Sequence, residues 1–344
     1  MHNDIEFHQQ QHLGIITLNR KQYLNALTLS MIQELQTQLS KWSIDDSVYA
    51  VIIKSNHDKV FCVGGDIRWL YNANFAEQMQ FFQNEYQLNH YIYTYPKPYI
   101  ALLDGITMGG GVGIALHGSH PIASENFVFA MPETNIGFFP DIGASYLLTR
   151  CIGEVGTYLG LSGNRLNVSE AKSCGLIKYV INKNDFDLLI QQLLLTDLSV
   201  GAYQKVDACI EKLSTVNYIT TMNYDLNVIN HCFKYNDMQQ IYSGLENIVS
   251  GWSNDIKLKL LKKSPLSLMI TLQKLRKSKD IDLKSCLMMD YILVQHFMRG
   301  TDFYEGVRAL LIDKDNLPQW QKLTDDDLVV LDYFKEDTTE LLEF

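Results

Sequence analysis

Residues 105–113 read GITMGGGVG and follow directly on the apolar run YIALL at residues 99–103. A continuous apolar run of this length is typical of a strand buried on both faces, and the glycines are typical of a tight turn from a strand into a helix. Residues 61–66, FCVGGD, form a second junction of the same kind. Glycines at such junctions let the backbone approach a ligand and leave helix N-terminal N–H groups free. Two such turns side by side could direct two N–H donors at one oxygen, although plain tight turns are the simpler explanation of the pattern.

The sequence on both sides of these turns continues the alternation of strands and helices. Thr28 is a suitable N-cap for a helix that runs to Trp42. Repeated strand, turn and helix units indicate an α/β layer with functional sites at the strand ends. From residue 183 onward the pattern is mainly helical, so we expect a core at residues 1–182 and a helical region at residues 183–344. Further strands are expected at residues 13–18, 49–53, 127–130 and 176–181.

The composition narrows the class of protein. The 344 residues carry a formal net charge of -10, which argues against a nucleic-acid surface. The six cysteines are scattered without a CxxC pair, so they predict reduced thiols and neither disulfides nor a zinc site. No apolar run reaches the length of about 18 residues that a membrane span needs. Residues 1–14, MHNDIEFHQQQHLG, show neither an apolar signal segment nor an Arg-rich amphipathic one, which leads us to expect a soluble cytoplasmic protein.

A third informative stretch is MPETNIGFFPD at residues 131–141, which contains two acids in apolar surroundings. Partial desolvation there would raise the pKa of Glu133 and Asp141 toward the range that suits general acid or base catalysis. Taken alone, each acid has an equally good structural explanation. Glu133 could cap a helix or form a salt bridge, and Asp141 could be the N-cap of a helix that begins near Ile142.

Other kinds of site have weaker support in the sequence. Neither glycine turn matches the dinucleotide or nucleoside-triphosphate signatures, and no GxSxG elbow is present. His117 and His120 lack a third ligand at metal spacing, so we expect neither a metal nor a separate cofactor. Residues 257–263, KLKLLKK, are typical of a solvated helix face, although they could also contact a phosphate.

On these residues the sequence resembles the crotonase (enoyl-CoA hydratase/isomerase) superfamily, and within it the 3-hydroxyisobutyryl-CoA hydrolase family. The resemblance extends over nearly the whole chain, with several motifs in the family's order. It implies an α/β fold with a crotonase-like ββα spiral core, followed by a helical C-terminal region that covers the acyl pocket. The matching segments are NAL (25–27), FCVGGD (61–66), KP (97–98), GITMGGGVG (105–113), MPETNIGFFPD (131–141), GASYL (143–147), SPLSL (264–268), MRG (298–300), DF (302–303), EGVRA (305–309) and LIDKD (311–315).

The resemblance also implies roles for single residues. The backbone N–H groups of Gly65 and Gly110 would form the oxyanion hole for a thioester carbonyl. Coenzyme A (CoA) would lie along residues 64–66, Gly64 to Asp66, and Arg68 is a candidate for its phosphates. Glu133, Asp141 and Glu85 would contact the substrate together with Gly110. For Glu85, the structural alternative of an exposed position on a helix is stronger than the corresponding alternatives for Glu133 and Asp141.

The acids also bear on which reaction of the superfamily to expect. Hydratases of this fold use two glutamates, of which one corresponds to Glu133 and the other falls at Gly113, which has no side chain. Asp141 stands where the hydrolases have aspartate. We therefore expect hydrolysis of 3-hydroxyisobutyryl-CoA, or of a near relative such as 3-hydroxypropionyl-CoA, in valine breakdown. Glu133 would act as nucleophile or as general base.

Two other functions remain open at this point: an enoyl-CoA hydratase or isomerase with rearranged acids, and a non-catalytic acyl-CoA-binding protein. The expected ligand is an acyl-CoA, with no nucleic-acid or membrane partner. Because hydratases of this fold are often oligomers, a homo-oligomer is an open expectation.

Overall fold

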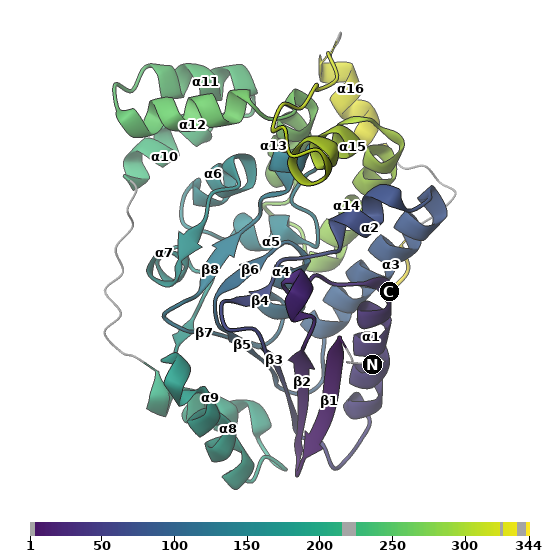
Figure 1. The fold of residues 1–344 in the computed structure, drawn as a ribbon. Helices are drawn as coiled ribbons and strands as arrows, with labels where there is room; N and C mark the ends of the chain where they lie inside the picture. The colour runs from purple at the N-terminus through teal and green to yellow at the C-terminus, as the bar shows by residue number, and fades with distance from the viewer. Residues whose placement is uncertain (1–3, 215–224, 324–325, 336–341) are drawn as a thin grey trace.

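The computed structural model describes residues 4–214, 225–323, 326–335 and 342–344. Two β-sheets form its centre, and helices cover them on several sides (Figure 1). The larger sheet has the strand order β1-β2-β3-β5-β7-β10 and is parallel except for the hairpin of β1 and β2. Its strands are β1 (Ile5–Gln10), β2 (Leu13–Leu18), β3 (Ala50–Ser55), β5 (Tyr99–Leu103), β7 (His120–Ala123) and β10 (Tyr179–Val180).

The smaller sheet has the order β4-β6-β8-β9, in which the first three strands are parallel. Its strands are β4 (Val60–Cys62), β6 (Ile106–Met108), β8 (Val128–Ala130) and β9 (Leu166–Asn167). Along the chain, a strand of the larger sheet is followed three times by a strand of the smaller sheet and then by helical structure. This repetition is the ββα spiral that the resemblance implies.

The spiral decides where a site can form. Parallel strands end at the same edge of their sheet, so the segments that follow β4, β6 and β8 meet there. These segments are residues 63–66, 109–110 and 131–141, which are the three stretches that the sequence singled out. Since neighbouring strands of a sheet lie only about 5 Å apart, the three segments lie close together.

Most predicted elements of the first half are confirmed. Thr28 caps α1 (Leu29–Ser43) by accepting a hydrogen bond from Met31 N at 3.2 Å. Strand β10 is shorter than expected, and the polar strand β1 has no counterpart in the prediction because only its first residue is buried. The other helices of this half are α2 (Ile67–Asn72), α3 (Phe75–Tyr93), α4 (Gly110–Leu116), α5 (Ala144–Leu148), α6 (Val155–Ser162) and α7 (Val168–Ser173), with the 3-10 turns η1 (Lys21–Tyr23) and η2 (Glu133–Ile136).

The second half is mainly helical, but its helices go to two places (Figure 1). Helices α8 (Phe186–Leu195) and α9 (Ala202–Leu213) pack on one face of the larger sheet and close a separate hydrophobic core there. The later helices lie at the opposite end and join the main core. The division at residue 183 remains a prediction. The later elements are α10 (Leu226–Phe233), α11 (Met238–Glu246), α12 (Gly251–Leu261), α13 (Pro265–Lys277), α14 (Leu283–Arg299), α15 (Asp302–Val307), the π-helix η4 (Arg308–Ile312) and α16 (Asp326–Tyr333).

Across these described helices, none combines the length and the apolar character that a bilayer crossing requires.

Candidate active site

A cavity of about 620 Å³ opens where the three strand ends meet. Its floor comes from the segments that follow β4, β6 and β8, one wall comes from α3, and α15 and η4 complete the other side. The lining is mostly apolar and aromatic, with four carboxyl side chains among it, as expected of a binding site for a small organic group. The lining residues that carry chemistry are Gly64, Gly65, Asp66, Arg68, Glu85, Gly109, Gly110, Glu133 and Asp141.

Two backbone N–H groups, those of Gly65 and Gly110, lie close together at the cavity floor. A Cβ atom on Gly64 would lie 3.0 Å from Gly110 N, and one on Gly110 would lie 3.3 Å from Gly65 N. Leu27 and Gly65 form a parallel bridge, in which Leu27 N donates to Gly64 O and Asp66 N donates to Leu27 O. The N–H of Gly65 takes no part in this bridge and points away from Leu27. The N–H of Gly110 is the first of helix α4 and has no partner within the helix. Both groups can therefore donate to one oxygen in the cavity.

Glycine is required at the turns that carry these groups. Gly64 has φ of +100° and Gly109 has φ of +53°, and side chains are strained at such angles. At Gly110 the reason is space, because a Cβ atom would overlap the Glu85 carboxyl group.

Three carboxyl groups surround the two donors. Glu133 begins η2, Asp141 lies in the loop before α5, and Glu85 lies on α3, and the three residues are 7%, 5% and 2% exposed. The Glu133 carboxyl lies beside Gly109, since a Cβ there would be 3.1 Å from Glu133 Oε1. Among the described residues, neither Glu85 Oε1 nor Glu133 Oε2 has a hydrogen-bond partner. The exposed position considered for Glu85 is wrong, because α3 turns this residue inward.

Burial raises the pKa of all three acids. It raises the pKa of Glu85 well above its ordinary value, and the charges of Asp141 and Glu133 raise it further. The pKa of Glu133 is likewise raised well above normal, by burial and then by Asp141. The pKa of Asp141 rises to about 7, because burial and the charge of Asp290 outweigh a hydrogen bond from Tyr86. Asp141 can thus gain or lose its proton near neutral pH.

The structural explanations for the two predicted acids fit the geometry less well. The N-cap of α5 is Gly143 and not Asp141. In the part of the chain that the structure describes, Asp141 instead accepts a hydrogen bond from the Tyr86 hydroxyl at 2.8 Å. Glu133 stands at the first position of η2, and no side-chain ion pair of Glu133 occurs among the described residues.

The position of the second hydratase acid is filled by another side chain. A Cβ atom on Gly113 would overlap the amide group of Asn89, which is fully buried on α3. Glu85, Tyr86 and Asn89 share one face of α3 at helical spacing, and this face closes the site. Tyr86 and Asn89 escaped the sequence reasoning, although their spacing from Glu85 was a usable signal.

The loop that carries the acids is held by side chains from the helical half. Lys263 Nζ donates to Thr134 Oγ1 at 2.9 Å and also to Asn135 Oδ1. Burial and the nearby Lys259 lower the pKa of Lys263 to about 7, against the opposite effect of Glu133. The expectation of a solvated face is therefore wrong at Lys263, which is 4% exposed.

Asp66 and Arg68, two of the residues expected to bind CoA, line the cavity, and the side chains of both also have partners within the protein. Asp66 caps α2 at Trp69 N and forms an ion pair with Arg20 at 2.9 Å. Arg68 is exposed, and its Nη2 donates to Leu311 O at 3.0 Å. A role of Gly64, Asp66 and Arg68 in CoA binding stays a prediction.

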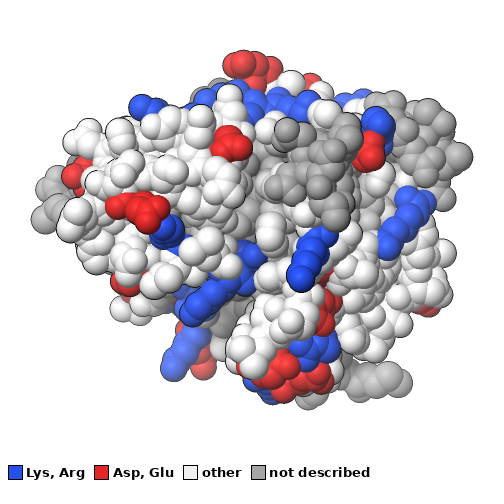
Figure 2. Space-filling view, turned by 90° about the horizontal axis from the view of Figure 1, so that it is seen from above, with Lys and Arg blue, Asp and Glu red and all other residues white. Residues whose placement is uncertain are grey.

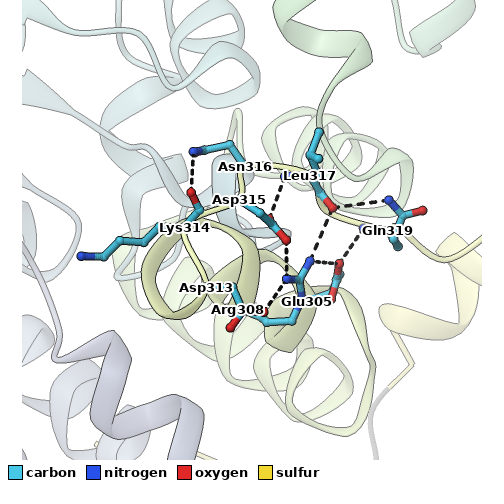
Figure 3. A network of polar contacts seen from close by, with 8 residues as sticks. All are labelled: Glu305, Arg308, Asp313, Lys314, Asp315, Asn316, Leu317 and Gln319. Carbon is cyan, nitrogen blue, oxygen red and sulfur yellow. Dashed lines mark hydrogen bonds and ion pairs between the residues drawn. The ribbon is translucent and has the colours of Figure 1, made fainter.

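Leu311 belongs to η4, and a polar network fixes this turn. Arg308 binds both carboxylate oxygens of Glu305 at 2.8 Å and also contacts Asp313 and Asp315 at 2.6 and 2.7 Å (Figure 3). The chain after η4 is thereby folded back on α15. Leu310 and Leu311 are held as the outer wall of the cavity.

The surface around this end of the molecule carries both signs of charge. Figure 2 shows Lys and Arg side chains interspersed with Asp and Glu on the face seen from above, without one continuous basic stripe. Among the described residues, no group of three or more His, Cys, Asp or Glu side chains is arranged to hold a metal ion. All six cysteines are buried and free.

The chain is similar to proteins of known function over most of its length. It is 40% identical over 329 residues to the mitochondrial 3-hydroxyisobutyryl-CoA hydrolase of Homo sapiens, which covers 92% of this chain and 84% of the relative. It is 38% identical over 330 residues to the same enzyme of Danio rerio, covering 94% and 86%.

The fold is similar to solved structures over the whole chain. A carnitinyl-CoA dehydratase from Mycobacterium thermoresistibile matches with a TM-score of 0.88 at 28% identity, covering 100% of this chain and 99% of the other. An enoyl-CoA hydratase from Rhodobacter sphaeroides 2.4.1 matches with a TM-score of 0.86 at 30% identity, covering 99% and 100%. The predicted crotonase-like α/β fold with helical C-terminal structure is confirmed.

The expected cytoplasmic location is contradicted, because these hydrolase relatives are named as mitochondrial proteins. The expectation depended on a missing signal pattern in residues 1–14. The sequence of a folded domain does not indicate the compartment in which the protein works. The lack of a recognisable signal in residues 1–14 was therefore not enough to predict a cytoplasmic location.

One family model, described as enoyl-CoA hydratase/isomerase, matches residues 13–330. With this match and the relatives above, the chain belongs to the enoyl-CoA hydratase/isomerase family, in its group of 3-hydroxyisobutyryl-CoA hydrolases.

Proposed function

We propose that this chain hydrolyses 3-hydroxyisobutyryl-CoA to 3-hydroxyisobutyrate and CoA, a step of valine breakdown. The observation that carries the proposal is the set of three buried carboxyl groups around two free N–H donors, with Asn89 in place of a second hydratase glutamate. The relatives with this activity in their names support it. CoA is part of the substrate, and the reaction needs no further cofactor.

The thioester carbonyl oxygen lies between the N–H groups of Gly65 and Gly110. As the carbonyl carbon is attacked, negative charge develops on this oxygen, and two fixed donors stabilise it better than they stabilise the ground state. The lining of the cavity is mostly apolar, and electrostatic interactions are stronger in such surroundings than in water.

Glu133 supplies the attack, either by removing a proton from water or by attacking the carbonyl carbon itself. In the first route, hydroxide adds to the carbonyl carbon, the C–S bond breaks, and the thiolate leaves with the free acid as the second product. In the second route, the Glu133 carboxylate adds to the carbonyl carbon, the C–S bond breaks and the thiolate leaves, which gives an anhydride between Glu133 and the acyl group that water then cleaves to the free acid. After a single turnover in H₂¹⁸O, ¹⁸O in the Glu133 carboxylate indicates the anhydride route with attack of water at the Glu133 carbonyl carbon.

Asp141 and Glu85 bind the acyl group. Asp141 is oriented by Tyr86 and accepts a hydrogen bond from the 3-hydroxyl of the substrate, while its charge raises the pKa of Glu133. Glu85 keeps its proton because burial raises its pKa, so it acts as a hydrogen-bond donor beside Gly110. A substrate without the hydroxyl loses the contact to Asp141.

The proposal is tested with two substrates. With 3-hydroxyisobutyryl-CoA we expect stoichiometric release of free thiol, and with crotonyl-CoA neither thiol release nor loss of the conjugated double bond. Rapid hydration of crotonyl-CoA without thiol release from either substrate would replace hydrolysis with the hydratase function that the similar structure from Rhodobacter sphaeroides carries in its name. Tight CoA binding without any turnover would make the chain a binding protein. The expected homo-oligomer remains a separate prediction.

A further inference from the structure

Asp141 lies in a part of the loop where the backbone has an uncommon conformation. Ile142, the next residue, has φ of +52°, which is unusual for a β-branched side chain, and Gly143 follows with φ of +69°. Two left-handed residues in succession turn the chain sharply into α5. Such a conformation persists where the surrounding structure fixes it, and it is common at functional sites.

Three buried side chains fix the backbone on both sides of Asp141. Lys274 Nζ, on α13, donates to Pro140 O, which precedes the acid. Asp290 Oδ2, on α14, accepts a hydrogen bond from Gly143 N at 2.7 Å. His117 Nε2, at the end of α4, is 2.8 Å from Ile142 O.

Lys274 and Asp290 also form an ion pair with each other, and their side chains are 1% and 0% exposed. A fully buried ion pair of this kind gives little stability by itself, because desolvation offsets the attraction of the charges. Stability alone therefore does not explain why this ion pair is present. The pair connects α13 to α14 and binds one backbone atom on each side of Asp141, so it can fix the position of the loop.

We propose that Lys274 and Asp290 are positioning residues for Asp141: the buried pair holds Pro140 O and Gly143 N and so fixes the direction in which the Asp141 carboxylate enters the cavity. The inference rests on the proposed hydrolysis. Neither residue lines the cavity, so both act through Asp141.

The pair also affects how Asp141 titrates. The charge of Asp290 raises the pKa of Asp141, whereas Lys274 lowers it. Among the described residues, Glu85 and Tyr86 on α3 and Glu133 on η2 also interact with Asp141, and His117 contacts the backbone of the next residue, Ile142. Removing the charge of Asp290 alone should therefore let Asp141 ionise at lower pH.

The test compares Asp290→Ala with Asp290→Asn in the full chain, using thiol release from 3-hydroxyisobutyryl-CoA. Alanine cannot accept the hydrogen bond from Gly143, so we expect kcat to fall by roughly 100-fold while KM stays within about 3-fold. The asparagine oxygen can still accept it, so we expect most of kcat to return, with the low-pH limb of the rate profile moved to lower pH. A residue with a merely structural role would not move this limb.

Two controls keep the outcome clear. The exposed pair Lys335 and Asp332, 2.6 Å apart, gives Asp332→Asn as a matched variant that should leave kcat and the pH profile unchanged. If Asp290→Ala fails to fold because Lys274 is left unpaired, the double variant Lys274→Met/Asp290→Ala has no unpaired buried charge and should fold with the same loss of kcat.

Wild-type kcat in the folded alanine or double variant would overturn the inference, and so would an asparagine variant identical to the alanine variant in both kcat and pH profile. Absence of thiol release from the unmodified protein would instead overturn the proposed function, which keeps the two failures apart.

Discussion

The glycine turns and the acid loop meet in one cavity but are held in different ways. The turns at residues 63–66 and 108–110 take their shape from positive backbone angles at glycine and from adjoining parallel strands, which are all local or neighbouring features. The loop at residues 131–143 is held by side chains of Lys263, Ser267, Lys274 and Asp290 from the helical half. The proposed oxyanion donors therefore belong to the core alone, whereas the loop with Glu133 and Asp141 depends on both halves of the chain.

This difference suggests how one core geometry can support several reactions. In the proposed mechanism, the backbone donors do the same task for any acyl-CoA, since every such substrate has a thioester carbonyl. The acids would then determine which bond breaks. Changes in the helical half can therefore alter the chemistry while the donors stay in place.

The largest effect is expected from removing the reactive acid alone. Glu133→Gln keeps the size of the side chain but cannot take a proton from water or attack the thioester, so kcat should fall by about 1,000-fold or more. CoA affinity, measured by calorimetry, should stay nearly unchanged because the turns are untouched. Glu34→Gln, on the exposed side of α1, is the control. Wild-type turnover in Glu133→Gln would remove this residue from the mechanism.

The next effect addresses the turns. Gly110→Ala brings a Cβ atom into the Glu85 carboxyl group and displaces one oxyanion donor, so kcat should fall by roughly 100- to 1,000-fold. Gly251→Ala is a matched control, because no atom lies within 4 Å of a Cβ there. Equal activity of the two alanine variants would contradict the oxyanion assignment.

A smaller effect is expected from removing the hydrogen bond that Tyr86, on α3, donates to Asp141. The Tyr86 hydroxyl stabilises the charged form of Asp141, so its removal in Tyr86→Phe should raise the pKa of Asp141 above its value of about 7. As the pH is lowered, the rate of this variant should therefore begin to fall at a higher pH than the rate of the unmodified protein. Near neutral pH, kcat should drop by about 10-fold. Tyr99→Phe removes an equally buried hydroxyl that donates to Ile114 O, and should leave the profile in place. An unshifted limb in Tyr86→Phe would argue against this coupling.

The smallest effect concerns the cavity mouth. Arg308→Gln loosens the network that holds η4, but this network is partly exposed, so we expect KM to rise only about 3- to 10-fold with little change in kcat. Lys335→Gln on the surface serves as control. A fall in kcat without any change in KM would instead indicate that Arg308 helps to position the loop at residues 131–143.

The sequence was informative where local chemistry decides the structure. The strand ends, both glycine turns and the capped helix at Thr28 follow from short patterns, and their convergence follows from parallel strands. Glu133 and Asp141 could be found because their apolar loop is itself a pattern. The resemblance to a family added Glu85 and the significance of Gly113.

Other parts of the site could not be read from local sequence. Lys274 and Asp290 reach the loop from residues more than a hundred positions away, and nothing near them in sequence marks this contact. Lys263 ends a stretch that resembles a solvated face, yet it is buried against Thr134. Long-range packing decides such cases, and periodicity within one helix does not contain that information.

The most direct test of the central claim follows the oxygen of water. Hydrolysis at the acid cluster, with 3-hydroxyisobutyryl-CoA turned over many times in H₂¹⁸O, should place ¹⁸O in the carboxylate of released 3-hydroxyisobutyrate, with one free thiol per acid formed. Mass spectrometry of the product measures both. Label found only in a hydroxyl group of an intact CoA thioester, without free thiol, would show addition of water to a double bond and would contradict the account.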